Sequence, residues 1–114
     1  MPVPSRRLKD LTAGALDHHA SRRWPALAEV TVGWRGSYGY LTGYLSETDD
    51  EDQIKLGRIQ YLGHPHDWAF AIWRASTDTY TEAVLLDGQP TGDPTQALDT
   101  ACTLYLTPTD EHPP

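Results

Sequence analysis

The side chains of this chain that are best suited to chemistry are two histidines and an acid on one predicted turn. The segment Gly63-His64-Pro65-His66-Asp67 places two imidazoles two residues apart, and in extended backbone both can point to the same side, toward a metal ion. A proline separates the pair, and no third ligand follows at a recognised spacing. The pattern therefore favours an ordinary turn, and we expect neither a metal nor another cofactor.

Other reactive residue types stand where structural roles are favoured. His18 and His19 are neighbours on a predicted helix, so their side chains diverge by about 100° and cannot share one ion. Cys102, the only cysteine, falls on the apolar face of a second predicted helix, where a thiol behaves as a small hydrophobe. The acidic run 47–52 lacks the glycine and the spaced oxygen ligands of a calcium loop.

The sequence also has no phosphate-binding glycine loop, no nucleophilic serine elbow and no carboxylate pair on a recognised scaffold. These observations favour a protein without catalytic activity. A small enzyme of unrecognised type is the third of the three functions that we consider.

Charge is distributed unevenly along the chain. The formal net charge is −7, yet residues 1–40 hold six Lys or Arg against three acids and net +3. Five of the remaining acids lie in the run 47–52, and two more lie in the Pro-rich segment 107–114, which we expect to be a disordered tail. The basic N-terminal part supplies the candidates for contact with nucleic acid, which are Arg6, Arg7, Arg22, Arg23 and Arg35.

Length and hydropathy bound the class of protein. A chain of 114 residues and 12.7 kDa suits one domain, which we place at 1–106. A hydrophobic fraction of 39% with four Trp and six Tyr is typical of a folded core. No apolar run approaches the roughly 20 residues that cross a bilayer, and the N-terminus lacks the apolar stretch of a signal peptide. Together with the single cysteine, this predicts a cytoplasmic protein without membrane contact.

One helix is predicted at each end of that domain. Ser5 can cap a helix that ends before Trp24-Pro25, because the residue ahead of a proline disfavours helical backbone. Its apolar positions recur at helical spacing, and we expect them on one buried face: Leu8, Leu11, Ala15 and Leu16.

The C-terminal helix has the sharper start signal. Asp93 can be its N-cap, Pro94 its first residue, and Gln96 the side chain that reaches back in a capping box. It is expected to end before Pro108. Its predicted buried face consists of Ala97, Leu98, Ala101, Cys102 and Tyr105.

Between the helices the apolar residues follow the two-residue period of strands. Segments 28–35 and 38–45 predict a hairpin. A third strand over 54–62 changes phase at Gly57, which predicts a β-bulge. The fourth, 68–75, is apolar on both faces and should be central, and 80–86 is the fifth. The fold class is therefore α+β: an about five-stranded, mostly antiparallel meander with an N-terminal and a C-terminal helix packed on one face.

Aromatic side chains are predicted on both faces of this sheet, whereas two helices of this length cover about one face. A partner protein or a second copy of the chain would cover the other, and our candidates for that interface are Tyr38, Tyr40, Tyr44 and Trp73. One alternative is a sheet that curls and buries these rings itself. The runner-up function is a nucleic-acid-associated accessory domain that uses the basic N-terminal helix. In it, bases of a single strand would stack on Tyr38, Tyr40 and Tyr44, with four further residues nearby: Trp34, Arg35, Arg58 and Arg74.

Two resemblances bear on these expectations. WRGSYGYLTGYL, WAFAIWRAS and GDPTQALDTACTLYL resemble, in this order over about residues 28–106, a group of small actinobacterial proteins of unknown function. Residues 70–106, a strand hairpin leading into the last of these blocks, are similar to the HicB antitoxin domain with its Gly-Asp-Thr turn and Glu-Ala-Leu helix. The second resemblance implies a protein-binding module that neutralises a partner, and its matching residues are Gly92, Asp93, Ala97, Leu98 and Ala101.

Overall fold

Two helices flank a meander of strands. The computed structural model describes residues 2–45, 53–74 and 76–106. Its elements, in chain order, are α1 (Arg6–Arg23), β1 (Leu27–Arg35), β2 (Tyr38–Leu45), β3 (Gln53–His64), β4 (Asp67–Arg74), β5 (Thr79–Ala83), β6 (Thr91–Gly92) and α2 (Pro94–Leu106). The strands lie in the order β1-β2-β3-β4-β5, and all paired neighbours are antiparallel. The predicted α+β meander is confirmed, while the acidic run 47–52 and the segment 107–114 lie outside the described residues.

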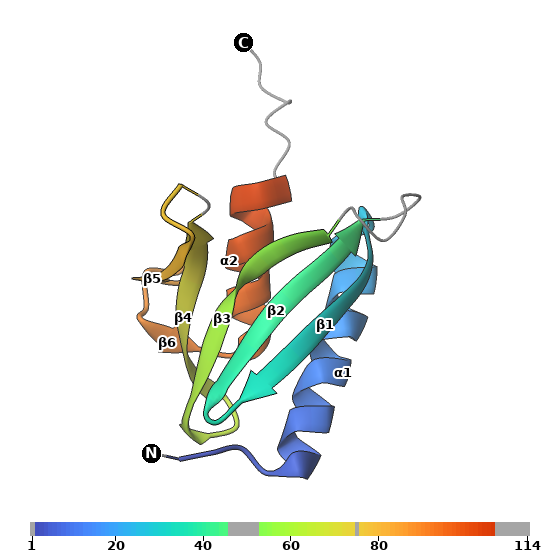
Figure 1. The fold of residues 1–114 in the computed structure, drawn as a ribbon. Helices are drawn as coiled ribbons and strands as arrows, with labels where there is room; N and C mark the ends of the chain where they lie inside the picture. Colours follow the sequence, from blue (N-terminus) through green and yellow to red (C-terminus); the bar gives the residue numbers. More distant parts are fainter. Residues whose placement is uncertain (1, 46–52, 75, 107–114) are drawn as a thin grey trace.

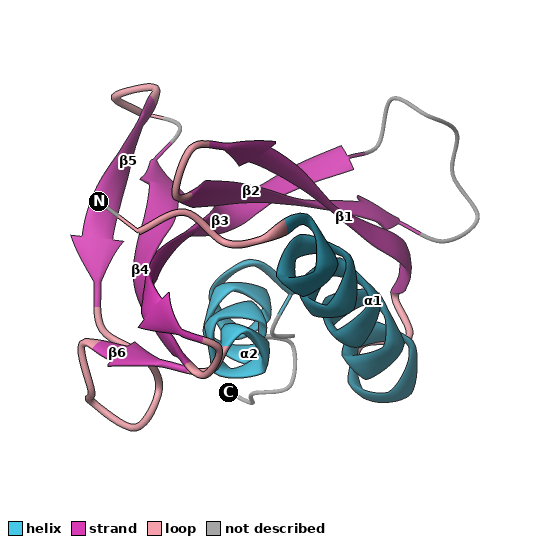
Figure 2. Cartoon of the chain, turned by 90° about the horizontal axis from the view of Figure 1, so that it is seen from below, coloured by secondary structure: helices cyan, strands magenta, loops and turns pink. Residues whose placement is uncertain are grey.

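Both helices lie on the same face of the sheet, which curves around them (Figures 1 and 2). The core is the cluster of apolar side chains between this face and the helices. Its fully buried members come from both helices and three strands: Leu16, Leu41, Leu56, Ile59, Trp68, Leu98 and Cys102. The opposite face of the sheet carries no helix in the part of the chain that the structure describes.

Helix α1 begins and ends as predicted, but its buried face differs from the prediction. The Ser5 hydroxyl accepts a hydrogen bond from Leu8 N at 3.1 Å, and the helix ends at Arg23, before Trp24-Pro25. Its buried residues are Thr12, Leu16 and Ala20. Leu11 and Ala15 are exposed, because α1 packs through a stripe one position around the helix from the predicted one.

The first hairpin keeps the predicted alternation over most of its length. Gly36, at φ 59°, makes the turn between Arg35 and Tyr38. A register shift between Leu27 and Glu29 buries Leu27 and leaves Ala28 exposed, so the strand begins one residue before the predicted start. The edge of β1 is joined to α1, since Val30 N donates a hydrogen bond to the Asp17 carboxylate at 2.9 Å.

The predicted bulge at Gly57 is confirmed. The register between β2 and β3 shifts where Leu41 pairs with Gly57 and Thr42 with Lys55. A Cβ atom on Gly57 would lie 2.7 Å from the carbonyl oxygen of Ala71 in the neighbouring strand β4. Only glycine therefore allows the two strands this close approach.

Strand β4 is central as predicted, but two short strands, β5 and β6, share the edge of β4 that faces away from β3. β5 pairs with the C-terminal half of β4 and ends at Ala83, three residues before the predicted end. The chain leaves the strand because Leu85 N donates to Gln89 O and Gly88 N donates to Leu85 O, which closes a turn over the buried Leu85. It then returns as β6, which sequence analysis missed, beside the start of β4.

Helix α2 has half of the predicted capping box. Asp93 N donates to Gln96 Oε1 at 2.9 Å, whereas the Asp93 carboxylate lies 3.1 Å from His66 Nδ1. Ala97, Leu98, Ala101 and Cys102 are buried as expected, and the side chain of Tyr105 lies outside the described residues. No helix within the described ranges combines the length and apolar character needed to cross a membrane.

Candidate functional site

The candidate site is the face of the sheet that points away from both helices, here named the outer face. Core residues Ile59 and Phe70 pair with each other and point to the helices, so their strand neighbours point outward. This alternation and the strand register define the outer face by the following residues: Glu29, Thr31, Gly33 and Arg35 on β1; Tyr38, Tyr40, Thr42 and Tyr44 on β2; Gln53, Lys55, Arg58 and Gln60 on β3; Ala69, Ala71 and Trp73 on β4; and Tyr80 and Glu82 on β5.

Four of these aromatic rings form one continuous chain of contacts, the ring cluster, which consists of Tyr38, Tyr40, Tyr80 and Trp73. Ring centroids lie 6.4 Å apart for Tyr38 and Tyr40, 5.4 Å for Tyr40 and Tyr80, and 5.0 Å for Tyr80 and Trp73. These are tilted or edge-on contacts, the geometries that aromatic pairs prefer. The cluster therefore spans from β2 to β5.

Two cations lie on the rings. Lys55 Nζ is 4.0 Å from the centroid of the Trp73 ring. The Arg58 guanidinium is 4.6 Å from the Tyr38 ring centroid and 5.4 Å from that of Tyr80. A cation over an aromatic face is attracted to the ring by about 0.5 to 1 kcal/mol at exposed sites. The outer face thus presents aromatic rings that contact one another, together with cations that lie over them.

The rings are half-buried, and they are buried by one another. Ala71 points outward and yet is only 2% exposed, so neighbouring outer-face side chains close over it. All four rings of the cluster retain intermediate exposure. The sheet therefore covers part of its own aromatic surface, and the remainder faces away from the molecule.

Three of the four predicted interface residues come together in this cluster. Tyr38, Tyr40 and Trp73 belong to it, and Tyr44 lies on the same face, at the other end of β2 beside Gln53. Tyr80 was missed, although its place opposite Trp73 in the next strand follows once the β4–β5 register is known. Trp34 lies on the inner face, 5.9 Å from the Trp68 ring, which contradicts its place in the nucleic-acid alternative.

The predicted nucleic-acid residues do not share one surface. Arg6 and Arg7 open the 18-residue helix α1, whereas Arg22 and Arg23 close it, roughly 24 Å away. Arg35 lies on the outer face at the end of β1. Arg74 follows Trp73 in β4 and so points to the opposite face.

A hollow borders the outer face at Ala69 and Glu82, where β5 and β6 separate along the edge of β4. Its volume is about 290 Å³, and its apolar lining includes Phe70, Ala83, Val84 and Pro90. Glu82 stands at its rim and also borders a shallow depression beside Arg58. One apolar side chain from another molecule fits a space of this size.

The residues first considered for chemistry lie away from this face. His64 and His66 have ring centroids 5.9 Å apart, and His64 Nδ1 accepts a hydrogen bond from His66 N at 3.2 Å. Within residues 2–45, 53–74 and 76–106, no three His, Cys, Asp or Glu side chains are grouped to hold a metal. Burial, with the nearby Asp99 carboxylate, raises the pKa of Cys102 to about 12, so its thiol is a poor nucleophile.

Asp99 joins the two helices on the other side of the molecule. Its Oδ1 atom accepts hydrogen bonds from Trp24 Nε1 at 2.8 Å and from His19 Nε2 at 2.9 Å, and Arg23 Nε lies 3.8 Å away. The carboxylate is mostly buried, with 21% of its side chain exposed. It therefore ties the end of α1 to the middle of α2, and it partly neutralises two basic side chains of α1.

Comparison of the chain with protein-family models, with curated proteins and with solved structures finds no match. Function is therefore inferred from the geometry of the outer face itself. That face offers aromatic edges, fixed cations and an adjacent apolar hollow, which are elements of binding.

Proposed function

We propose that this chain is a non-catalytic binding protein that acts through protein–protein contact, with a second copy of the chain covering its outer face. The observation that carries the proposal is the ring cluster, which is ordered and cation-bearing on a face that no described helix covers. An aromatic surface of this extent on a small domain marks a contact with another molecule.

The composition of the face supports a protein as the occupant. Tyr, Trp and Arg are the residues that dominate binding energy in protein interfaces. The rings already hold one another in place, so little conformational entropy is lost when a partner binds. The hollow beside Phe70 can accept an anchoring side chain at the edge of the outer face.

The charges of the face support a second copy as the occupant. A two-fold interface must be complementary to itself, so it needs both signs of charge on one surface. The outer face has cations at Arg35, Lys55 and Arg58 and acids at the edge strands, Glu29 on β1 and Glu82 on β5. A surface built for phosphates would instead be uniformly basic.

The ring contacts also favour protein over nucleic acid. Bases stack on open aromatic faces. Here Lys55 lies over the Trp73 ring and Arg58 over the Tyr38 ring, so these cations occupy positions that bases would take. A protein partner needs only the ring edges and the outward N–H groups of Arg58.

Hydroxyl-radical footprinting over a dilution series tests the proposal. Oxidation of Tyr40, Trp73 and Tyr80 should fall several-fold from dilute to concentrated protein, because association removes these rings from water. Leu104, which is 57% exposed on α2, is the internal control and should be oxidised equally at all concentrations. Equal oxidation of the three rings at every concentration would refute self-association through the outer face.

A further inference from the structure

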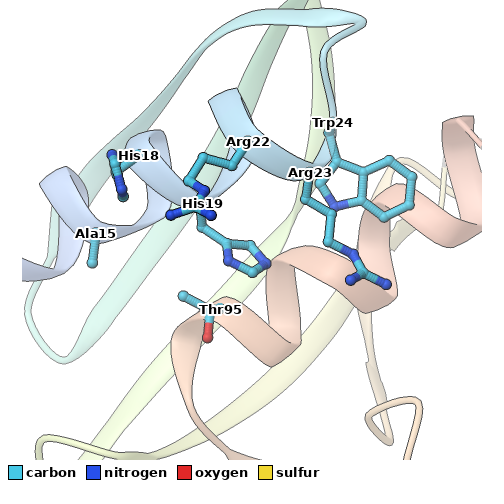
Figure 3. Close-up of a pocket in the computed structure, with 7 residues that line it drawn as sticks. All are labelled: Ala15, His18, His19, Arg22, Arg23, Trp24 and Thr95. Atoms are coloured by element: carbon cyan, nitrogen blue, oxygen red, sulfur yellow. The ribbon is translucent and has the colours of Figure 1, made fainter.

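A continuous groove runs between α1 and α2 on the side of the molecule opposite the outer face. Two hollows form it, and they meet at Ala15 of α1 and Thr95 of α2, which line both. One hollow has a mostly apolar lining, which also includes Pro65 of the β3–β4 turn and the paired side chains of His66 and Asp93. The other is lined by basic side chains from the last turns of α1, as Figure 3 shows.

The α1 wall of this groove has the spacing of a helix-packing seam. Leu8, Leu11, Ala15, His18 and Arg22 follow one another at alternating intervals of three and four residues. This alternation keeps side chains in line along a helix of about 3.5 residues per turn, the arrangement by which one helix packs alongside another. All five residues line the two hollows.

The first half of the seam is apolar and open to solvent. Leu11 lies in the second turn of α1 and is 58% exposed, whereas the residues that α1 buries against the core lie on another side of the helix. Ala15 beside it is also exposed, and Pro94 of α2 faces both across the groove. Leu11 and Ala15 are not buried in the core, so their apolar surface can pack against a partner.

The second half of the seam is basic, and its cations are available. His19 and Arg23 are directed to the Asp99 carboxylate. Among the described residues, no acid pairs with the Arg22 guanidinium or with the His18 ring, which point along the groove wall (Figure 3). A carboxylate placed here would accept hydrogen bonds from these unpaired donors, next to the apolar half of the groove.

From this juxtaposition we propose that the α1–α2 groove is a second interaction site, which binds an amphipathic acidic helix of a partner protein. Apolar residues of that helix pack on Leu11 and Ala15, and its Asp or Glu residues lie against His18 and Arg22. The occupied groove would be a three-helix layer, with the partner lying along α1 for about 20 Å.

Charge complementarity and the shape of the groove select this occupant over a small anion or a nucleic acid. A free anion would use the basic half and leave Leu11 in water. A nucleic-acid backbone needs cations along its length, whereas this seam has them at one end only. An amphipathic helix satisfies both halves of the seam at once.

Selection from a displayed library of helical peptides, about 15 residues long to match the seam, tests the proposal on the full chain. Enriched peptides should carry Leu, Ile or Met at intervals of three and four residues, with Asp or Glu concentrated in one half. Binding of those peptides to Leu11→Glu and to Arg22→Glu proteins should be weaker by about tenfold or more. Both changes are at exposed positions, and thermal melting confirms that each variant is folded.

Arg6→Glu is the matched control, because Arg6 is exposed on the same helix but lies about 160° around it from Arg22. It should leave peptide binding unchanged. A repeated selection on the Arg22→Glu protein should return Lys or Arg in place of the acids, a result that no folding defect produces. Peptides without acidic enrichment, or peptides that bind the Leu11→Glu protein equally well, would overturn the proposal. Retention of a single-stranded oligonucleotide that Arg22→Glu abolishes would overturn it in favour of nucleic acid.

Discussion

Cys102 shows at the scale of a single residue how burial decides chemistry. Its thiol is fully buried on the inner side of α2, and desolvation, followed by the charge of Asp99, raises its pKa from 9.0 to about 12. The thiolate is the nucleophile, so its population at a given pH sets reactivity. The sequence predicted a core cysteine from its place on the apolar helix face, and this is confirmed.

We predict that Cys102 resists thiol reagents in the folded protein. At about pH 8, a shift from 9.0 to about 12 lowers the thiolate fraction about 1000-fold, since one pKa unit is a factor of ten. Ellman's reagent should therefore react with native protein at least this much more slowly than with protein unfolded in urea. Comparable rates in the two states would contradict the burial of this side chain.

The raised pKa of Cys102 also predicts that the folded protein becomes less stable at high pH. The pKa of the thiol is higher in the folded than in the unfolded state, so at high pH the folded protein retains a proton that the unfolded chain releases. The contribution to stability is complete below pH 9.0 and is lost progressively as the pH rises toward about 12. In urea unfolding at pH 8 to 11, the stability of the wild type should therefore fall with pH by more than that of Cys102→Ala, which lacks this thiol.

At the scale of elements, Gly57 allows β3 and β4 to lie close together at the bulge. A methyl group there would lie 2.7 Å from the Ala71 carbonyl oxygen and 2.9 Å from the Phe70 ring. We predict that Gly57→Ala lowers the free energy of unfolding by about 1 to 3 kcal/mol, the usual cost of overpacking. The urea midpoint measures this loss.

Gly33→Ala is the matched control within the same sheet. A Cβ atom at Gly33 meets nothing within 4 Å, so the change should alter stability by less than about 0.5 kcal/mol. Equal effects of the two substitutions would show that the bulge at Gly57 does not restrain the strands.

Most elements of the fold could be predicted because local signals coincide with them. Ser5 and Trp24-Pro25 mark both ends of α1, and the phase change at Gly57 marks the bulge. Sequence analysis missed β6 because a two-residue strand has no periodicity. The exposure of Leu11 also escaped it, because the direction in which a helix packs depends on the sheet beneath it.

Part of the candidate site was also predictable from a local signal in the sequence. Alternation along β2 placed Tyr38 and Tyr40 on one face. Tyr80 and the cations escaped notice, since their contacts join β3, β4 and β5 and depend on register between strands. The α1–α2 groove was not foreseen, because its two walls are some 80 residues apart in the chain.

At the scale of the whole molecule, one curved sheet separates two different surfaces. Its inner face and the two helices bury the core, and its outer face carries the ring cluster (Figure 2). The proposed peptide groove lies beyond the helices, so it and the outer face can be occupied together. If both proposals hold, one chain can bind its own copy and an acidic helix at the same time.

The mass of the protein in solution tests the central proposal most directly. Light scattering of the wild type should give twice the 12.7 kDa of one chain, whereas a Tyr40→Glu, Trp73→Glu double variant should be a folded monomer, because two carboxylates would replace the apolar rings that the interface buries. Leu104→Glu, on α2, should remain dimeric. A wild type with the mass of a single chain would contradict the proposal, and a double variant that also unfolds would then mean that the ring cluster serves the stability of the monomer.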